Sequence, residues 1–234
     1  MNSFDSSIVS FFNGFAQRWH ALDESMVFLS ESSLMKGGLF LAMLWWLWFR
    51  KPADGPDRRD YVLSTLVMCV AAVLIARLLA VSLPFRERPL VASAQELVVP
   101  YGVDVRALEG WSAFPSDHAV LFFALSMGLY CAHRRFGIAA FLYAAFVVCL
   151  PRIYLGLHWP TDVLAGAALG VAFGWLGTLR AVRDAVSRPA LRWHDQHPGA
   201  FYAAMFVVSF EIMNIFADAR SAMHLSLHIL RDLL

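Results

Sequence analysis

The chain has 234 residues, of which 59% are hydrophobic and 16% are charged, and its formal net charge is +1. Soluble domains usually have roughly 45–50% apolar and about 25% charged residues, so this composition excludes an ordinary soluble protein. The mean hydropathy of +0.57 points the same way. We therefore expect an integral membrane protein whose main partner is the bilayer. The near-neutral charge offers no basic surface for nucleic acid, so no nucleic-acid partner is expected.

Residues 1–33 are predicted to form an amphipathic helix. Apolar residues recur there at helical spacing, at Ile8, Phe11, Phe12, Phe15, Trp19, Leu22 and Met26. Such a helix can lie in the membrane interface or pack against a helix bundle, and the pattern allows both. The region lacks a basic start followed by an uninterrupted apolar core, so no cleavable signal peptide is expected.

Six apolar stretches are predicted to cross the membrane as helices, because each approaches the length of about 20 residues that a bilayer requires. These stretches are 34–49, 61–83, 116–132, 138–156, 160–179 and 201–217. The predicted fold class is therefore all-α: an integral membrane bundle of about six transmembrane helices, preceded by the N-terminal amphipathic helix.

Basic residues gather in three connections between these helices, at 50–59, 134–135 and 180–192. The three connections alternate along the chain and hold ten of its nineteen Lys and Arg residues. Cytoplasmic loops carry an excess of Lys and Arg, so these connections are predicted to be cytoplasmic. The loop 84–115 and the turn around His158 then lie on the outer face.

The two outer connections carry polar residues beside prolines. Pro115 and Pro160 are each predicted at the first position of a helix. A helix that begins at Pro115 leaves free backbone N–H groups at Ser116 and its two successors, which suits an anion. His158 and Asp162 are four residues apart at the second helix start, so their side chains can lie on one face.

This set of residue types fits phosphoryl transfer. That reaction needs neutralisation of spreading negative charge, which arginines and backbone N–H groups supply. A neutral histidine can attack phosphorus if a carboxylate holds its other nitrogen, and a second histidine can protonate the leaving oxygen. His158 with Asp162, and separately His118, match those roles.

Three ordered blocks resemble the signature of the type 2 phosphatidic acid phosphatase superfamily. They are Arg88-Pro89, then Pro115-Ser116-Asp117-His118, and then Arg152 with His158 and Asp162. The resemblance covers about residues 61–180. It divides the single membrane domain, 1–234, into the helix at 1–33, a catalytic core at 61–180, and a cytoplasmic linker with the last helix at 181–234.

The resemblance implies a role for each matching residue. His158 is the nucleophile that forms a phosphohistidine, Asp162 orients it, and His118 is the general acid. Arg88, Arg152 and Ser116 hold the phosphate. No metal and no cofactor are implied.

The chain departs from the signature at three positions. Val81 stands where the signature has a lysine, and Arg86 is the expected substitute as a phosphate ligand. Pro151 stands in place of a serine. Asp117 replaces a glycine, and the resulting "FPSDH" looks like the undecaprenyl-diphosphate phosphatases of the superfamily. We expect Asp117 to point away from the phosphate, because its charge would repel it.

The expected function is a metal-independent lipid phosphatase in a bacterial-type inner membrane, with its site on the periplasmic side. The expected reaction converts undecaprenyl diphosphate to the monophosphate. Phosphatidic acid, phosphatidylglycerol phosphate and lipid A phosphate are alternative substrates. A lipid phosphotransferase and a non-catalytic lipid-headgroup binding or transport protein are alternative functions. The oligomeric state is not predicted.

Each site residue also has a simpler interpretation. Asp162 can be a helix-start residue chosen for the helix dipole, and Arg88 and Arg152 can extend toward lipid headgroups. His118 can be an ordinary interfacial histidine. Elsewhere, the small residues Gly166, Gly170 and Gly174 predict close helix packing. The pair His224 and His228 has a metal-like spacing but no apparent third ligand, so no metal is expected there.

Overall fold

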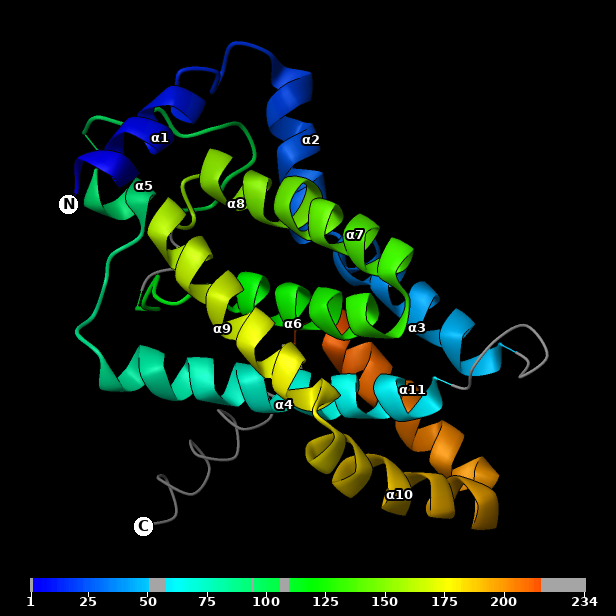
Figure 1. Cartoon of the computed structure of the whole chain (residues 1–234). Helices are drawn as coiled ribbons and strands as arrows, with labels where there is room; N and C mark the ends of the chain where they lie inside the picture. The colour runs from blue at the N-terminus through cyan, green and yellow to red at the C-terminus, as the bar shows by residue number, and fades with distance from the viewer. Residues whose placement is uncertain (1, 51–57, 94, 106–109, 216–234) are drawn as a thin grey trace, which may run out of the picture.

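The computed structural model describes residues 2–50, 58–93, 95–105 and 110–215, and within these ranges every regular element is a helix (Figure 1). Three helices form the centre: α4 (Arg59–Ser82), α6 (Asp117–Ala132) and α9 (Pro160–Thr178). Helix α6 packs against both of the others. Most of the apolar α6 is buried, and Val120, Leu121, Phe122, Ala124 and Leu125 have no exposed surface.

Close contact between α6 and α9 depends on glycines. A Cβ atom at Gly166, Gly170 or Gly174 would lie 2.3–2.6 Å from a carbonyl oxygen of α6 or of its N-cap residue. Such distances are too short for any side chain, so only glycine lets the two backbones approach this closely. The predicted packing role of this glycine stripe is confirmed.

A continuous helical stretch leads from residue 134 to residue 154. It consists of α7 (Arg134–Tyr143), the π-helical turn η4 (Ala144–Cys149) and α8 (Leu150–Tyr154). The π-helical turn stands directly before Pro151, which has no N–H to donate to the preceding turn. The stretch carries Arg152 into the interior, where this side chain is 9% exposed.

Among the described residues, three helical stretches are long and apolar enough to cross a membrane: α4, residues 134–154, and α9. A fourth is possible if α2 (His20–Glu31) and the helix 34–49, bent by 63°, form one broken span. That helix consists of η1 (Leu34–Gly38) and α3 (Leu39–Phe49). Helices α6 and α11 (Pro198–Met213) are apolar but have 16 residues each. The predicted count of six spans therefore exceeds the three or four that helix length supports.

Large apolar side chains remain exposed on the outward faces of this bundle. They include Leu74, Leu78, Phe146, Leu164, Trp175, Phe206 and Val207. A patch of this extent is unfavourable in water but is solvated by lipid tails. Together with the candidate spans, it agrees with a multi-pass membrane protein.

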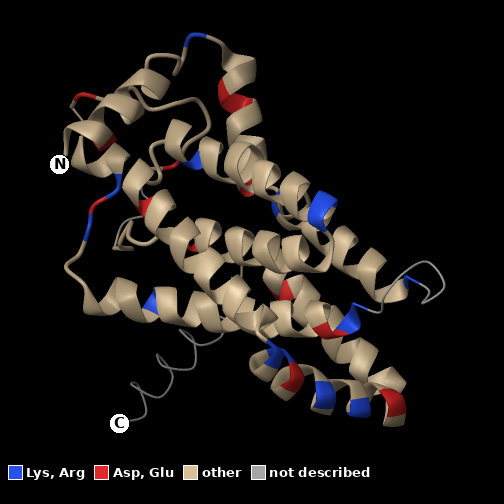
Figure 2. Cartoon of the chain, in the orientation of Figure 1, with Lys and Arg blue, Asp and Glu red and all other residues tan. Residues whose placement is uncertain are grey.

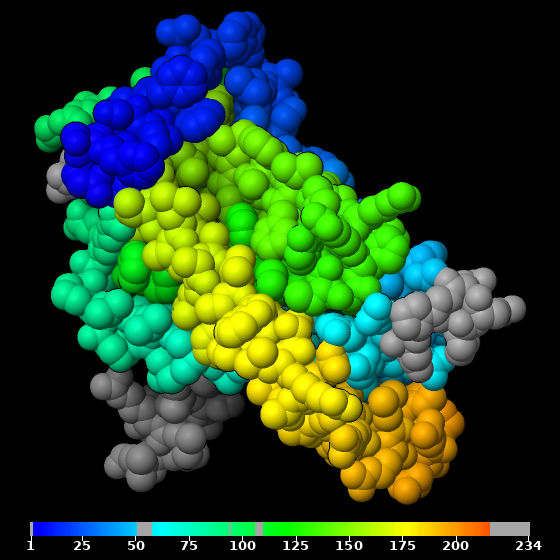
Figure 3. Space-filling model, in the orientation of Figure 1, coloured from blue at the N-terminus to red at the C-terminus, as the bar shows by residue number. Residues whose placement is uncertain are grey.

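The N-terminal region forms two helices, so the prediction of a single helix over 1–33 is wrong. Helix α1 (Ser3–Asn13) ends at Gly14, and α2 begins after Trp19. Between them, Gln17 has a φ of 60°, which no α-helix accommodates. Helix α1 lies over α8 and the start of α9, where it covers one end of the molecule (Figure 3).

The segment predicted as a polar linker contains a further helix, α10 (Arg180–Gln196), which leads into α11. The Nε atom of Arg183 lies 2.8 Å from a carboxylate oxygen of Asp60, which joins α10 to the start of α4. The basic residues of α10 and of the start of α7 lie at the end of the bundle opposite α1 (Figure 2). His224 and His228 lie outside the described residues.

Candidate active site

His158 sits in the short turn between α8 and α9. Gly156 makes this turn with a φ of 62°, a conformation that favours glycine, and its carbonyl accepts a hydrogen bond from Leu90 at 3.1 Å. Leu90 belongs to the short helix α5 (Pro89–Ala92) directly after Arg88. The backbone N–H of His158 donates to the carbonyl of Arg152 at 3.3 Å. The turn therefore brings the first and third sequence blocks together around a histidine that is 5% exposed.

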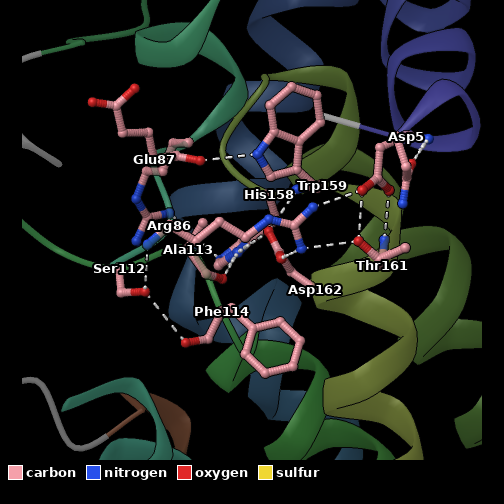
Figure 4. Close-up of polar contacts among 12 residues, drawn as sticks. Asp5, Arg86, Glu87, Ser112, Ala113, Phe114, His158, Trp159, Thr161 and Asp162 are labelled. Carbon is pink, nitrogen blue, oxygen red and sulfur yellow. Dashed lines mark hydrogen bonds and ion pairs between the residues drawn. The ribbon is translucent and has the colours of Figure 1, made fainter. Parts of the chain in front are cut away.

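The imidazole of His158 is held by a backbone carbonyl. Its Nδ1 lies 2.9 Å from the carbonyl oxygen of Ala113, so Nδ1 carries the proton and donates it (Figure 4). The other nitrogen, Nε2, therefore keeps its lone pair and lies 3.5 Å from Nη1 of Arg88. Burial lowers the pKa of His158 to about 4, which keeps the ring neutral near neutral pH.

Asp162 is fully buried and accepts hydrogen bonds from two sides. Its Oδ2 accepts the backbone N–H of Trp159 at 2.8 Å, which caps α9, and its Oδ1 accepts Nη1 of Arg86 at 2.5 Å. The same Oδ2 lies 3.8 Å from Nδ1 of His158, beyond hydrogen-bond distance. Asp162 is thus a helix cap and also the carboxylate next to the histidine.

Arg86 is bound by protein oxygens rather than directed into open space. Besides Asp162, its Nη1 donates to Oγ1 of Thr161 at 2.9 Å, and its Nη2 donates to Oδ2 of Asp5 at 2.6 Å. Asp5 comes from α1, is fully buried, and also accepts the N–H and the hydroxyl of Thr161 at 2.9 and 2.6 Å (Figure 4). This geometry favours a role in holding Asp162 over the predicted role as a phosphate ligand.

Sequence reasoning missed Asp5 and Thr161. The available signal was weak: a single carboxylate near the start of a helix is common, and its partners are 81 and 156 residues away.

Three buried donors in the three sequence blocks have no hydrogen-bond partner among the described residues. They are the Nε atoms of Arg88 and Arg152 and the hydroxyl of Ser116. One terminal nitrogen of each arginine is anchored, on the carbonyl of Leu157 at 2.7 Å and of Ser30 at 2.5 Å respectively. Unsatisfied buried donors are costly, so their concentration here points to a bound anion that accepts from them.

Helix α6 begins at Asp117, not at Pro115 as predicted. Ser116 is its N-cap, and the N–H of Ser116 donates to the carbonyl of Asp162 at 3.2 Å, which fixes this helix start against α9. The carboxylate of Asp117 pairs with Arg77 of α4.

His118, in the first turn of α6, lines a cavity of about 370 Å³ together with Arg152 and Leu157. Lys36, Glu31 and Asn214 also line it. The position of the lysine in the resembled signature is taken by Val81, which is 87% exposed on α4. Within the described residues, no group of three or more His, Cys, Asp or Glu side chains is placed to hold a metal ion.

Comparison with known proteins gives a consistent picture. The profile of the PAP2 superfamily matches residues 61–184. Undecaprenyl-diphosphatase BcrC of Bacillus subtilis (strain 168) is 26% identical over 164 residues, which cover 70% of this chain and 77% of that protein. Lipid A 1-diphosphate synthase of Escherichia coli (strain K12) is 30% identical over 159 residues, covering 66% and 63% of the two chains.

A solved structure has a similar fold. It is the crystal structure of a transmembrane PAP2-type phosphatidylglycerolphosphate phosphatase from Bacillus subtilis. The TM-score is 0.50 at 23% identity, and the match covers 74% of this chain and 82% of that one. The likeness supports the helical membrane fold.

Proposed function

Because the chain belongs to the PAP2 superfamily, we propose that it is a lipid phosphatase that hydrolyses a membrane lipid phosphate or diphosphate through a phosphohistidine. The observation that carries this proposal is the geometry at His158. Nε2 is neutral, with its tautomer set by the Ala113 carbonyl, and lies 3.5 Å from Nη1 of Arg88, while Arg152 and Ser116 each keep a buried donor without a partner among the described residues. Such an arrangement holds a phosphoryl group in front of a nucleophile.

In the first step, Nε2 of His158 attacks phosphorus while the bond from phosphorus to the leaving oxygen breaks. His118 protonates that oxygen, and Arg88, Arg152 and Ser116 neutralise the equatorial oxygens. In the second step, His118 takes a proton from water, which attacks the phosphohistidine and releases phosphate. The distance of 3.8 Å between Asp162 and Nδ1 is one that can shorten when substrate binds, since catalytic hydrogen bonds often tighten in the complex.

The proposed substrate is a polyprenyl diphosphate, with undecaprenyl diphosphate the first candidate. The "FPSDH" block and the name of the Bacillus subtilis relative support this choice. The proposed location is a bacterial inner membrane with the site on the periplasmic side. A lipid can keep its tail in the bilayer there while its phosphate reaches the cavity.

The test is phosphate release by the purified protein in detergent with EDTA, using undecaprenyl diphosphate and phosphatidic acid. The His158→Ala variant should lose at least about a thousandfold in kcat, as expected for removal of a nucleophile. His118→Ala should lose about 10²–10⁴-fold, as expected for a general acid. Full activity of His158→Ala on both lipids would contradict the mechanism and favour a non-catalytic headgroup-binding protein.

A phosphotransferase is the second candidate, and the Escherichia coli relative named as a synthase is the observation that favours it. The phosphohistidine would then pass its phosphoryl group to an acceptor on a lipid instead of to water. Product analysis with and without an acceptor lipid separates the two. Free phosphate in both cases supports hydrolysis, and a phosphorylated acceptor without free phosphate supports transfer.

A further inference from the structure

Lys36 is a buried cation that the proposed mechanism does not use. It belongs to the π-helical turn η1 between α2 and α3, far in sequence from the three blocks of the active site. The residue is 9% exposed and lines the same cavity of about 370 Å³ as His118 and Arg152. Its ammonium group therefore faces the space next to the proposed phosphate site.

Among the described residues, no hydrogen bond or ion pair holds the Lys36 ammonium group, although Glu31 attracts it. Arg152 lies close enough to repel it. The carboxylates that line the cavity, Glu31 and Asp104, are both exposed, so water screens their charge. The Lys36 side chain is largely buried and lines the cavity, so an anion bound there would interact with its ammonium group at reduced screening.

Arg152 interacts both with His158 and with Lys36. It acts electrostatically on His158 together with Arg88, and it also acts on Lys36. Arg88 lies next to Nε2 of His158, and Arg152 and Lys36 both line the cavity. A single phosphate at Nε2 can be held by Arg88 and Arg152, and Lys36 is left for a second anionic group.

We propose that Lys36 binds the second phosphate of a diphosphate lipid, the phosphate that stays on the lipid when His158 takes the terminal one. This inference rests on the proposed phosphatase function. When the bond from Nε2 to the terminal phosphorus forms, the bond to the bridging oxygen breaks, and its electron pair stays on the lipid monophosphate. The leaving oxygen takes its proton from His118, and Lys36 neutralises the charge that remains on that phosphate, so Lys36 favours diphosphates over monophosphate esters.

The experiment compares Lys36→Met and Lys36→Arg with the control Arg135→Met. The control removes an exposed cation in the first turn of α7, away from the cavity. On undecaprenyl diphosphate, Lys36→Met should lose about 10- to 100-fold in kcat/KM, the effect of a hydrogen bond to a charged group. On phosphatidic acid it should lose less than about threefold. Lys36→Arg should recover part of the loss, and Arg135→Met should match wild type.

A binding measurement keeps this inference separate from the proposed function. Pyrophosphate and orthophosphate are titrated into wild type and Lys36→Met by calorimetry, with the thermal midpoint as the folding control. Weaker binding of pyrophosphate alone supports the role of Lys36, even if wild type hydrolyses neither lipid and the proposed function fails. Equal losses on both lipids and both anions, or no loss on any, would overturn it.

Discussion

At the scale of single residues, the proposed chemistry depends on the neutral imidazole of His158. Two surroundings produce it: the Ala113 carbonyl sets the tautomer, and burial disfavours the charged form. A carbonyl cannot be protonated, so this support does not change with pH, unlike that from a carboxylate.

The pH dependence follows from the lowered pKa of His158. Above pH about 4 the ring is neutral and Nε2 can attack, and as the pH falls through about 4 the ring is protonated and the nucleophile is lost. The acidic limb of kcat/KM, which reports on the free enzyme, should therefore have its midpoint near pH 4. The substrate phosphate also ionises in this pH range. Its pKa is therefore measured separately by phosphorus NMR, and its contribution is subtracted from the pH profile. A midpoint at pH 6.5 or above would contradict this prediction.

Substitution of Arg86 tests whether this side chain positions the Asp162 carboxylate or binds the substrate phosphate. If Arg86 acts through Asp162, Arg86→Lys should lower kcat with little change in KM, because a single ammonium group cannot serve both Asp162 and Asp5. A fall in kcat of about tenfold, as for a loosened positioning group, is expected. A rise in KM with unchanged kcat would instead restore Arg86 as a phosphate ligand.

At the scale of elements, α1 is part of the active site although it lies outside the region of family resemblance. Its Asp5 completes the chain of contacts from α1 through Arg86 to Asp162, and Thr161 of α9 joins the same cluster. The helix therefore positions the start of α9, and with it the turn that carries His158.

Removal of the Asp5 charge should show whether α1 affects the site through Arg86 and Asp162. Asp5→Asn leaves a buried arginine contact imperfectly satisfied and should cost about 1–3 kcal/mol of stability, with kcat reduced and KM unchanged. Asp184→Asn is the matched control, because Asp184 pairs with Arg188 on the surface, where ion pairs contribute about 0–1 kcal/mol. Wild-type kcat in folded Asp5→Asn would show that α1 is irrelevant to the site.

The contact between α6 and α9 gives a second prediction at this scale. In Gly170→Ala the new Cβ would lie 2.3 Å from the carbonyl oxygen of Val120, so the helices must separate. Overpacking of this kind costs about 1–3 kcal/mol and should lower the thermal midpoint in detergent. Gly199→Ala is the control, since nothing lies within 4 Å of its Cβ, and the midpoint should stay or rise. Equal midpoints for both variants would contradict the packing argument.

At the scale of the whole molecule, the basic residues of α10 and of the start of α7 lie at the end of the bundle opposite α1, which covers the proposed site (Figure 2). The proposed orientation has the basic end in the cytoplasm and the cavity on the outer face. The exposed apolar side chains between the two ends then contact lipid.

Cysteine labelling in intact cells tests this orientation. A membrane-impermeant maleimide should label Glu96→Cys and should leave Arg135→Cys unlabelled until the membrane is permeabilised. Both residues are exposed. The two substitutions are made in a Cys131→Ala protein, whose remaining cysteines, Cys69 and Cys149, are buried and should not react. The reverse labelling pattern would place the site in the cytoplasm.

Local chemistry in the sequence determined much of this protein. Composition and the length of apolar runs predict a helical membrane protein, because burial in lipid depends on the residues of each helix alone. Pro160 begins α9 as predicted, since proline is suited to the first helical position. The stripe of glycines predicts close packing for a similarly local reason.

Tertiary structure alone decided the contacts between distant segments. The Ala113 carbonyl on His158, Asp5 on Arg86 and Lys36 in the cavity come from elements whose relative placement no local pattern contains. Arg86 shows the difference: its position near Arg88 predicted a phosphate ligand, and only the fold shows that two buried carboxylates contact it. The role of a charged side chain depends on the buried charges next to it, and the tertiary structure determines which charges those are.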